Sequence, residues 1–242
     1  MSKYTFIILL VFTRCVTAVA QSSQDSLKSH KASLEFKVNS TGVFPYSGSL
    51  ENLHTNVTAS FLYNTKTWSF FFEKSVDLQD AGTGLNYACA GFYREFAVTK
   101  KFSFTPSIGY AASQAIKLTG TSPEVDLIAV ASYKISKKVL LENTTMFSDV
   151  VERCGPQALY NRLKITYRAK IFDLNLFMWN CPPLWNNTNR FSISPEIVFK
   201  NLKIAKHLCL LASAGYYKML VTGKTSNIKN SFIFTLTVPV NL

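Results

Sequence analysis

The amino-acid sequence predicts an all-β protein: a transmembrane antiparallel up-and-down β-barrel of about 12 strands, preceded by a cleaved signal peptide. Three observations lead to this prediction. Apolar and polar residues alternate with the period of two that places successive side chains on opposite faces of a strand. Long links alternate with short links between these segments, and the first residues are those of a secretory leader.

The N-terminus carries the parts of a signal peptide. A basic start at Lys3 is followed by the short apolar run 6–12, and Ala18-Val19-Ala20 before Gln21 is a small-x-small cleavage site. We therefore expect cleavage between Ala20 and Gln21. Residues 1–20 are assigned to the signal peptide, 21–32 to a polar periplasmic lead-in and 33–242 to an outer-membrane β-barrel.

Composition supports strands and export. The chain has 19 Phe and 11 Tyr, is 48% hydrophobic and is 17% charged, and aromatic residues favour strands. Its net charge of +12 raises nucleic acid or anionic lipid as partners, but the signal peptide argues against nucleic acid. Beyond residue 20 no apolar run is long enough for a spanning helix, so a membrane-spanning form must be a closed barrel.

The alternation continues through the chain after residue 33. The predicted strands contain, in order, residues 34–38, 57–63, 68–72, 85–97, 102–110, 125–133, 139–147, 160–170, 172–179, 191–199, 208–216 and 232–242. In the eighth strand Leu163, Ile165 and Tyr167 alternate with polar residues, and in the ninth Leu174 and Leu176 do so. An even strand number of this kind is typical of bacterial outer-membrane barrels.

The links separate into two classes. Short turns are predicted at 64–66, 99–101, 136–138 and at Asn201, whereas long links fall at 41–54, 73–84, 113–124, 148–158, 180–189 and 218–230. A soluble sandwich gives no reason for the long links to gather at one end, but outer-membrane barrels have short periplasmic turns and long external loops. Aromatic residues near predicted strand ends are expected in an interfacial belt: Trp68, Tyr93, Tyr133, Tyr160 and Trp179.

One hairpin carries a resemblance. Tyr93-Arg94-Glu95-Phe96, leading through Lys100-Lys101 into Phe102-Ser103-Phe104, resembles hairpins of Bacteroidota barrels. With the signal peptide and the apolar last strand, the chain is similar to small bacterial outer-membrane β-barrels over about residues 33–242. The resemblance implies a bacterial outer membrane, with long loops extracellular and short turns periplasmic. The last strand departs from the usual terminal aromatic residue, because it ends Val240-Asn241-Leu242.

Four cations lie on the polar side of one segment: Arg162, Lys164, Arg168 and Lys170. We call them the cationic row. If they line a wet lumen, they concentrate anions and favour a porin-like channel for anionic solutes. Alternatively, they pair with inward carboxylates such as Glu35, Asp173 and Glu196 and fill a closed barrel, which would act as a structural, binding or secretion-accessory protein through its external loops. A third interpretation is a sheet edge that binds an anionic polymer.

Other chemistry is sparse. Cys154 and Cys181 fall in long links on the same side, and an oxidising location would favour a disulfide between them. No His or Cys spacing fits a metal site, so we expect no metal and no cofactor. Some 12-stranded outer-membrane barrels are lipid hydrolases, but their His-x-Ser motif is missing, so we expect no enzyme. The expected partners are outer-membrane lipid and small anionic solutes.

Overall fold

The structure, a computed structural model, describes residues 31–43, 50–80, 86–113, 124–151, 158–182, 189–205, 208–221 and 230–241. The predicted signal peptide with its Ala20–Gln21 cleavage site, and most of the lead-in, lie outside these residues. No helix among the described residues is long and apolar enough to cross a membrane.

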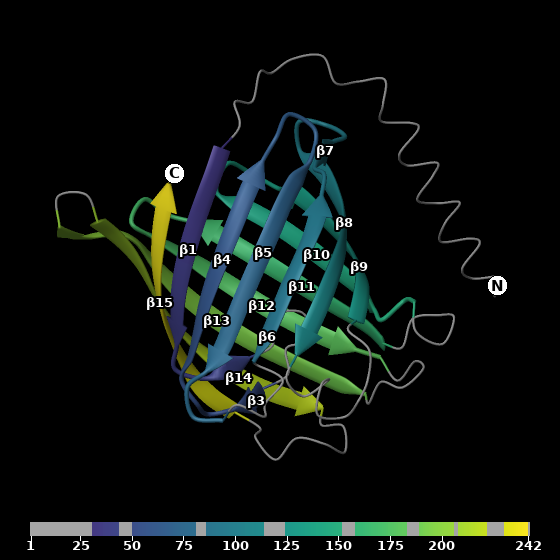
Figure 1. The fold of residues 1–242 in the computed structure, drawn as a ribbon. Helices are drawn as coiled ribbons and strands as arrows, with labels where there is room; N and C mark the ends of the chain where they lie inside the picture. The colour runs from purple at the N-terminus through teal and green to yellow at the C-terminus, as the bar shows by residue number, and fades with distance from the viewer. Residues whose placement is uncertain are drawn as a thin grey trace.

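The described residues form a closed antiparallel barrel of twelve wall strands (Figure 1). β6 and β7 pair with β8 in one register and together make one wall strand. The strands are β1 (Lys31–Asn39), β4 (Asn56–Asn64), β5 (Ser69–Asp77), β6 (Tyr87–Tyr93), β7 (Phe96–Ala97), β8 (Phe102–Ser113), β9 (Glu124–Lys134), β10 (Val139–Ser148), β11 (Ala158–Arg168), β12 (Phe172–Cys181), β13 (Arg190–Ala205), β14 (Leu208–Val221) and β15 (Asn230–Asn241).

Two pairings close the cylinder. Each strand pairs with its neighbours in the chain, and β1 pairs with β15 from Ser33↔Asn241 to Asn39↔Thr235, which joins the two ends of the chain. The β6–β8 pairing completes the ring. The predicted all-β, up-and-down barrel of about 12 strands is therefore confirmed, and the soluble sandwich is not what forms. The sheet-edge interpretation of the cationic row is wrong, because β11 pairs with β10 and β12 and has no free edge.

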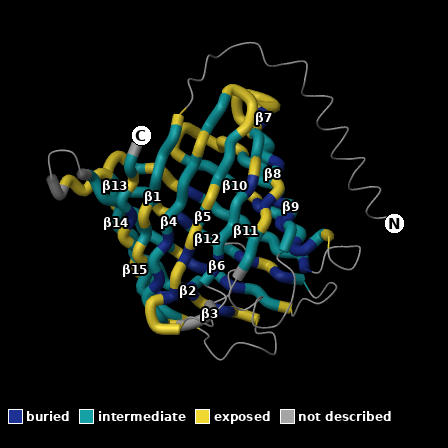
Figure 2. The backbone as a smooth tube through the Cα atoms, in the orientation of Figure 1, coloured by how far each residue is buried: buried dark blue, intermediate teal, exposed yellow. Residues whose placement is uncertain are grey.

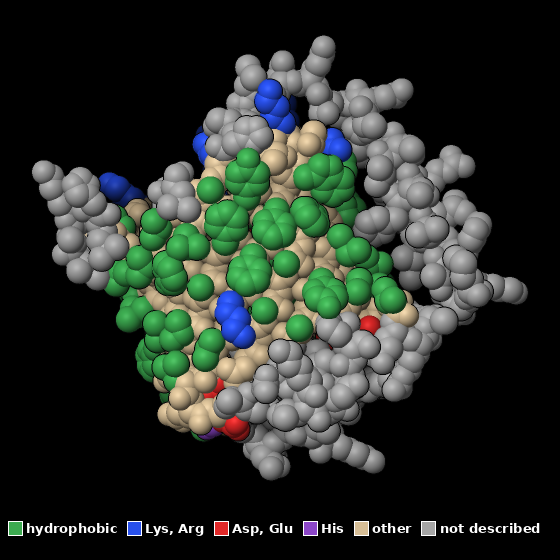
Figure 3. Space-filling model, in the orientation of Figure 1, with side chains coloured by type: hydrophobic (Ala, Val, Ile, Leu, Met, Phe, Trp, Pro, Cys, Tyr) green, Lys and Arg blue, Asp and Glu red, His purple; other side chains and the backbone are tan. Residues whose placement is uncertain are grey.

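The two faces of the wall differ in polarity in the way expected for a barrel in lipid. Buried polar residues lie on the inner face: Asn56, Thr58, Ser75, Asp77, Asp126, Thr144, Thr166, Asn175, Ser192, Ser194 and Thr237. Exposed large apolar residues lie on the outer face: Phe36, Val38, Phe72, Val76, Phe92, Ile108, Tyr110, Tyr133, Tyr167, Leu174, Phe199, Phe232, Phe234 and Leu236. Figure 2 shows these burial classes following one another along single strands, and Figure 3 shows the apolar outer surface.

Three short turns are stabilised by the same pattern of hydrogen bonds. Thr65, Thr99 and Ser136 each accept two backbone N–H bonds through the side-chain hydroxyl, from the residues two and three positions further on, at 2.9–3.3 Å. A Ser or Thr hydroxyl that bonds the following backbone stabilises such a turn. Lysine follows each hydroxyl residue, so these turns place positive charge at the short-link end.

Two predicted links differ from expectation. Asn201 is not a turn: it has φ 57° within β13, and the register with β14 shifts between Phe199 and Leu202, so it forms a bulge beyond which the hairpin continues. β13 and β14 extend beyond their neighbours at the left of Figure 1. The long link after β1 contains a small hairpin of β2 (Gly42–Val43) and β3 (Leu50–Asn52).

The predicted aromatic belt is partly wrong. Trp68 and Tyr133 are exposed, as an interfacial belt requires. Tyr93, Tyr160 and Trp179 instead share the inner-face parity, and Trp179 is only 5% exposed. Proximity to a strand end does not reveal the face on which a side chain lies.

The difference in polarity between the two faces of the wall predicts that one added charge lowers the free energy of unfolding by different amounts on the two faces of β9. Ala129 is the central residue of β9 on the outer face, and Ser132 lies on the inner face. We expect Ala129→Arg to destabilise the barrel by about 2–4 kcal/mol, the cost of Arg at the bilayer midplane, and Ser132→Arg by less than about 1 kcal/mol, since its side chain faces a polar lumen. Urea titration of protein refolded into phospholipid vesicles, with heat-modifiable gel migration as the readout, measures both values. Equal costs at the two positions would contradict the assignment of the faces.

Candidate functional site in the barrel lumen

Hydrogen bonds connect the polar side chains of the inner wall from strand to strand. Thr166 Oγ1 donates to Asn175 Oδ1 at 2.9 Å, and Asn175 Nδ2 donates to Glu196 Oε2 at 2.8 Å, which links β11, β12 and β13. Across β4 and β5, Thr58 donates to Ser75 at 3.2 Å and Ser60 donates to Glu73 at 2.8 Å. These hydrogen bonds give partners to polar groups that would otherwise be buried in the wall without one.

The cationic row is divided between wall and turn. Arg162 and Lys164 flank the middle of β11 on its inner face, Arg168 ends that strand on the same parity and is exposed, and Lys170 lies in the exposed turn before β12. Each of the two inner-face cations has one contact with a neutral group: Arg162 Nη2 donates to Thr144 Oγ1 at 3.2 Å, and Lys164 Nζ is 5.3 Å from the Phe177 ring centroid.

The carboxylates considered as partners of the row have other contacts. Glu35 forms an ion pair with Lys37 at 2.7 Å on the same strand. Asp173, the register partner of Arg168, instead pairs with Lys200 at 2.7 Å. Glu196 accepts the bond from Asn175 described above. The inward carboxylates named from the sequence are therefore engaged by groups outside the row.

Other carboxylates on the inner face moderate the positive charge. Glu142 is the register partner of Lys164 on β10. Glu73, central in β5, accepts hydrogen bonds from Ser60 and Tyr87. Asp126 on β9 accepts the backbone N–H of Asp149 at 3.0 Å. The lumen is thus lined by both signs of charge, with the inner cations of β11 close together on one wall.

An apolar cluster narrows the lumen toward the long-link end. Trp179, Tyr217 and Met219 are at most 6% exposed and pack together on the inner face, with Phe177 stacked on Trp179 at 5.3 Å. Val43 of the β2–β3 hairpin packs against this cluster, and Asn56 Nδ2 donates to the backbone oxygen of Thr41 at 3.1 Å. The described start of the first long link, at Thr41 and Val43, therefore lies inside the barrel, over the inner face of β12–β14.

The remaining predicted site residues are placed only in part. Cys181 ends β12 on the inner face and is 1% exposed, whereas Cys154 lies outside the described residues, so the proposed disulfide stays a prediction. Sequence reasoning missed the Lys200–Asp173 pair and the packing of Phe177 and Trp179 beside the row. Strand parity placed both aromatic residues on the same side as Lys164, but no sequence signal indicated the inserted hairpin.

Comparison with known proteins gives the fold. No protein-family model and no curated protein matches the chain. A solved structure described as "KdgM porin" aligns with a TM-score of 0.55 at 6% identity, covering 86% of this chain and 97% of that chain. One described as "KdgM porin in complex with disordered oligogalacturonate" gives 0.53 at 7% identity, with 86% and 97% covered. A NanC porin structure gives 0.52 at 7% identity, with 85% and 97% covered.

At these identities the comparisons show the fold alone: the chain has the fold of outer-membrane porins. The predicted outer-membrane β-barrel with porin-like architecture is confirmed at this level. The predicted location in a bacterial outer membrane agrees with this fold and with the apolar outer face.

Water access to the inner wall can be tested at two adjacent positions. Lys164 faces the lumen, and Ile165 faces outward. In a background with the native cysteines replaced by alanine, we expect Lys164→Cys to react with a charged methanethiosulfonate at least about tenfold faster than Ile165→Cys, because thiols react as solvated thiolates. Mass spectrometry of the refolded protein in vesicles measures both rates. Slow labelling at both positions would indicate a lumen closed to water at this depth.

Proposed function

We propose that the protein is a porin-like channel that passes small polar solutes across a bacterial outer membrane and favours anionic ones. The observation that carries this proposal is the position of Arg162 and Lys164, side by side on the inner wall of a twelve-stranded barrel. Transport rather than catalysis is proposed, with no cofactor.

The strand number supports an aqueous path. Eight strands leave an interior that side chains can fill, whereas larger barrels enclose more space. This wall has twelve strands among the described residues. Cations that line a pore raise the local concentration of anions, because low-dielectric walls focus their field.

The carboxylates in the lumen limit how strongly we expect the channel to favour anions over cations. Because Glu142 and Glu73 also face inward, the inner cations of β11 form an anion-binding wall rather than a uniformly basic pore. We therefore expect a moderate anion preference. One similar structure is described as a porin in complex with disordered oligogalacturonate, which fits a small carboxylate-bearing solute as the class to test first.

A specific observation favours a second candidate. Val43 packs onto the Trp179 cluster, and Thr41 is buried, so these two residues of the first long link narrow the external half of the lumen. If this closes the path, the protein is a non-conducting barrel that binds a partner through its external loops.

Replacing inner cations is expected to lower anion selectivity. Two unit charges 4 Å apart in water interact by about 1 kcal/mol, which is about fivefold for one cation, so the Arg162→Gln/Lys164→Gln variant should have an anion-to-cation permeability ratio lower by at least about fivefold. Reversal potentials in a KCl gradient across planar bilayers measure this ratio. Lys137→Gln/Lys138→Gln removes the same charge from an exposed turn and should leave the ratio nearly unchanged.

Two outcomes would contradict the channel proposal. A cation-selective wild-type pore, or a ratio that changes equally in both double variants, would remove the role of the β11 wall. Absence of conductance from correctly folded protein would favour the non-conducting barrel.

A further inference from the structure

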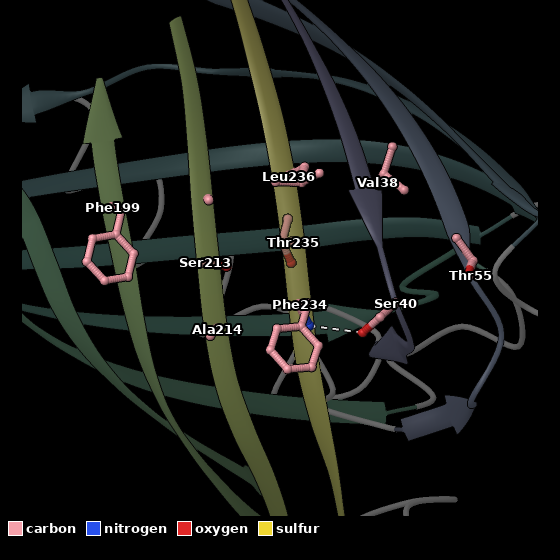
Figure 4. A pocket seen from close by; sticks show the side chains of 10 residues that line it. Val38, Ser40, Thr55, Phe199, Ser213, Ala214, Phe234, Thr235 and Leu236 are labelled. Atoms are coloured by element: carbon pink, nitrogen blue, oxygen red, sulfur yellow. Dashed lines mark hydrogen bonds between the residues drawn. The ribbon is translucent and has the colours of Figure 1, made fainter. Parts of the chain in front are cut away.

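A furrow of about 530 Å³ lies on the outer face of the barrel, over β13, β14, β15 and β1 (Figure 4). Its floor is formed by Ala212 and Ala214 on β14. Phe199 on β13 lies on one side of the floor, and Phe234 and Leu236 on β15 lie on the other. Small residues between larger neighbours therefore leave a channel along the middle strand.

The furrow faces the membrane. Phe199, Phe234 and Leu236 are 40–57% exposed and belong to the apolar outer surface. Hydrocarbon surrounds this surface in a bilayer, so a soluble ligand does not reach it. The molecules that meet the furrow are lipids, and its walls suit an acyl chain.

A cation lies on the same face of β14, toward the long-link end. Lys218 is exposed and has Ile193 and Asn230 as register partners on the outer face. Between Lys218 and the furrow floor, the rings of Tyr216 and Phe232 lie 5.0 Å apart. Tyrosine is enriched at the level of lipid headgroups, and Phe232 packs beside Tyr216.

The spacing matches one lipid molecule. Lys218 is four residues beyond Ala214, or about 13 Å along a strand and about 10 Å along the membrane normal at the usual tilt of barrel strands. One leaflet of the hydrocarbon core is about 15 Å deep. A headgroup at Lys218 and an acyl chain over Ala214 therefore fit within a single leaflet, at the end of the barrel that the long links place outside.

We propose that this furrow is a specific site for a phosphorylated glycolipid of the outer leaflet. One acyl chain lies over Ala212 and Ala214, the Tyr216–Phe232 pair flanks it, and Lys218 binds the phosphate. The charge of Lys218 gives the site its preference for an anionic headgroup. The site is separate from the lumen and does not depend on conduction.

Native mass spectrometry of protein refolded from inclusion bodies into detergent tests the proposal, because such protein carries no bacterial lipid. Lipid A, phosphatidylglycerol and phosphatidylcholine are added in turn, and bound lipid is counted. We expect lipid A to bind most tightly of the three lipids. Lys218→Gln should weaken the binding of lipid A by about fivefold, which is the contribution of one cation at the membrane surface. Ala214→Phe should weaken the binding of lipid A because the larger side chain fills the furrow.

Matched controls lie elsewhere on the outer face. Lys74 is an exposed outward lysine on β5, and Ala129 is an outward alanine on β9. Lys74→Gln and Ala129→Phe should leave lipid A binding unchanged, and gel migration confirms that each variant folds. Equal losses in control and site variants would overturn the proposal. So would equal binding of phosphatidylglycerol or phosphatidylcholine, or an unchanged affinity in Lys218→Gln.

Discussion

Closure of the hydrogen-bond ladder is the constraint on which this structure depends. A strand in hydrocarbon cannot leave a backbone N–H or C=O unpaired, because lipid offers no partner. Pairing of β1 with β15 and of β6 with β8 removes both sheet edges. Once the cylinder is closed, each strand has one face toward lipid and one toward the lumen, and the buried polar residues gather on the inner face while most exposed apolar residues lie on the outer face.

The lumen shows how polar residues are accommodated inside such a wall. Thr166, Asn175 and Glu196 satisfy one another across three strands, and Lys200 holds both Asp173 and the backbone oxygen of Ala169. Lys200 thereby pairs with Asp173, the register partner of Arg168, while Glu196 is held by the Asn175 amide. Arg162 and Lys164 contact Thr144 and Phe177 on the same wall, and Glu142 lies opposite Lys164.

The two faces also separate two kinds of ligand. In the proposed function, the inner wall selects solutes through charge. In the proposed lipid site, the outer wall selects through shape, because Ala212 and Ala214 leave space between larger neighbours, and charge contributes at the headgroup level near Lys218. Because β14 contributes Tyr217 and Met219 to the lumen cluster and Ala214 to the furrow, one strand takes part in both sites without connecting them.

The sequence alone determined the strand number, the order of long and short links and the face of the inner β11 cations, because alternation with period two is a local property. It did not determine which groups meet across strands. Asp173 pairs with Lys200 because register brings β12 and β13 together, and Val43 reaches the Trp179 cluster because the start of the first link lies inside the barrel. Asn201 forms a bulge because pairing with β14 continues past it. These contacts depend on strand register and on the course of a link through space, and neither is encoded in residue alternation.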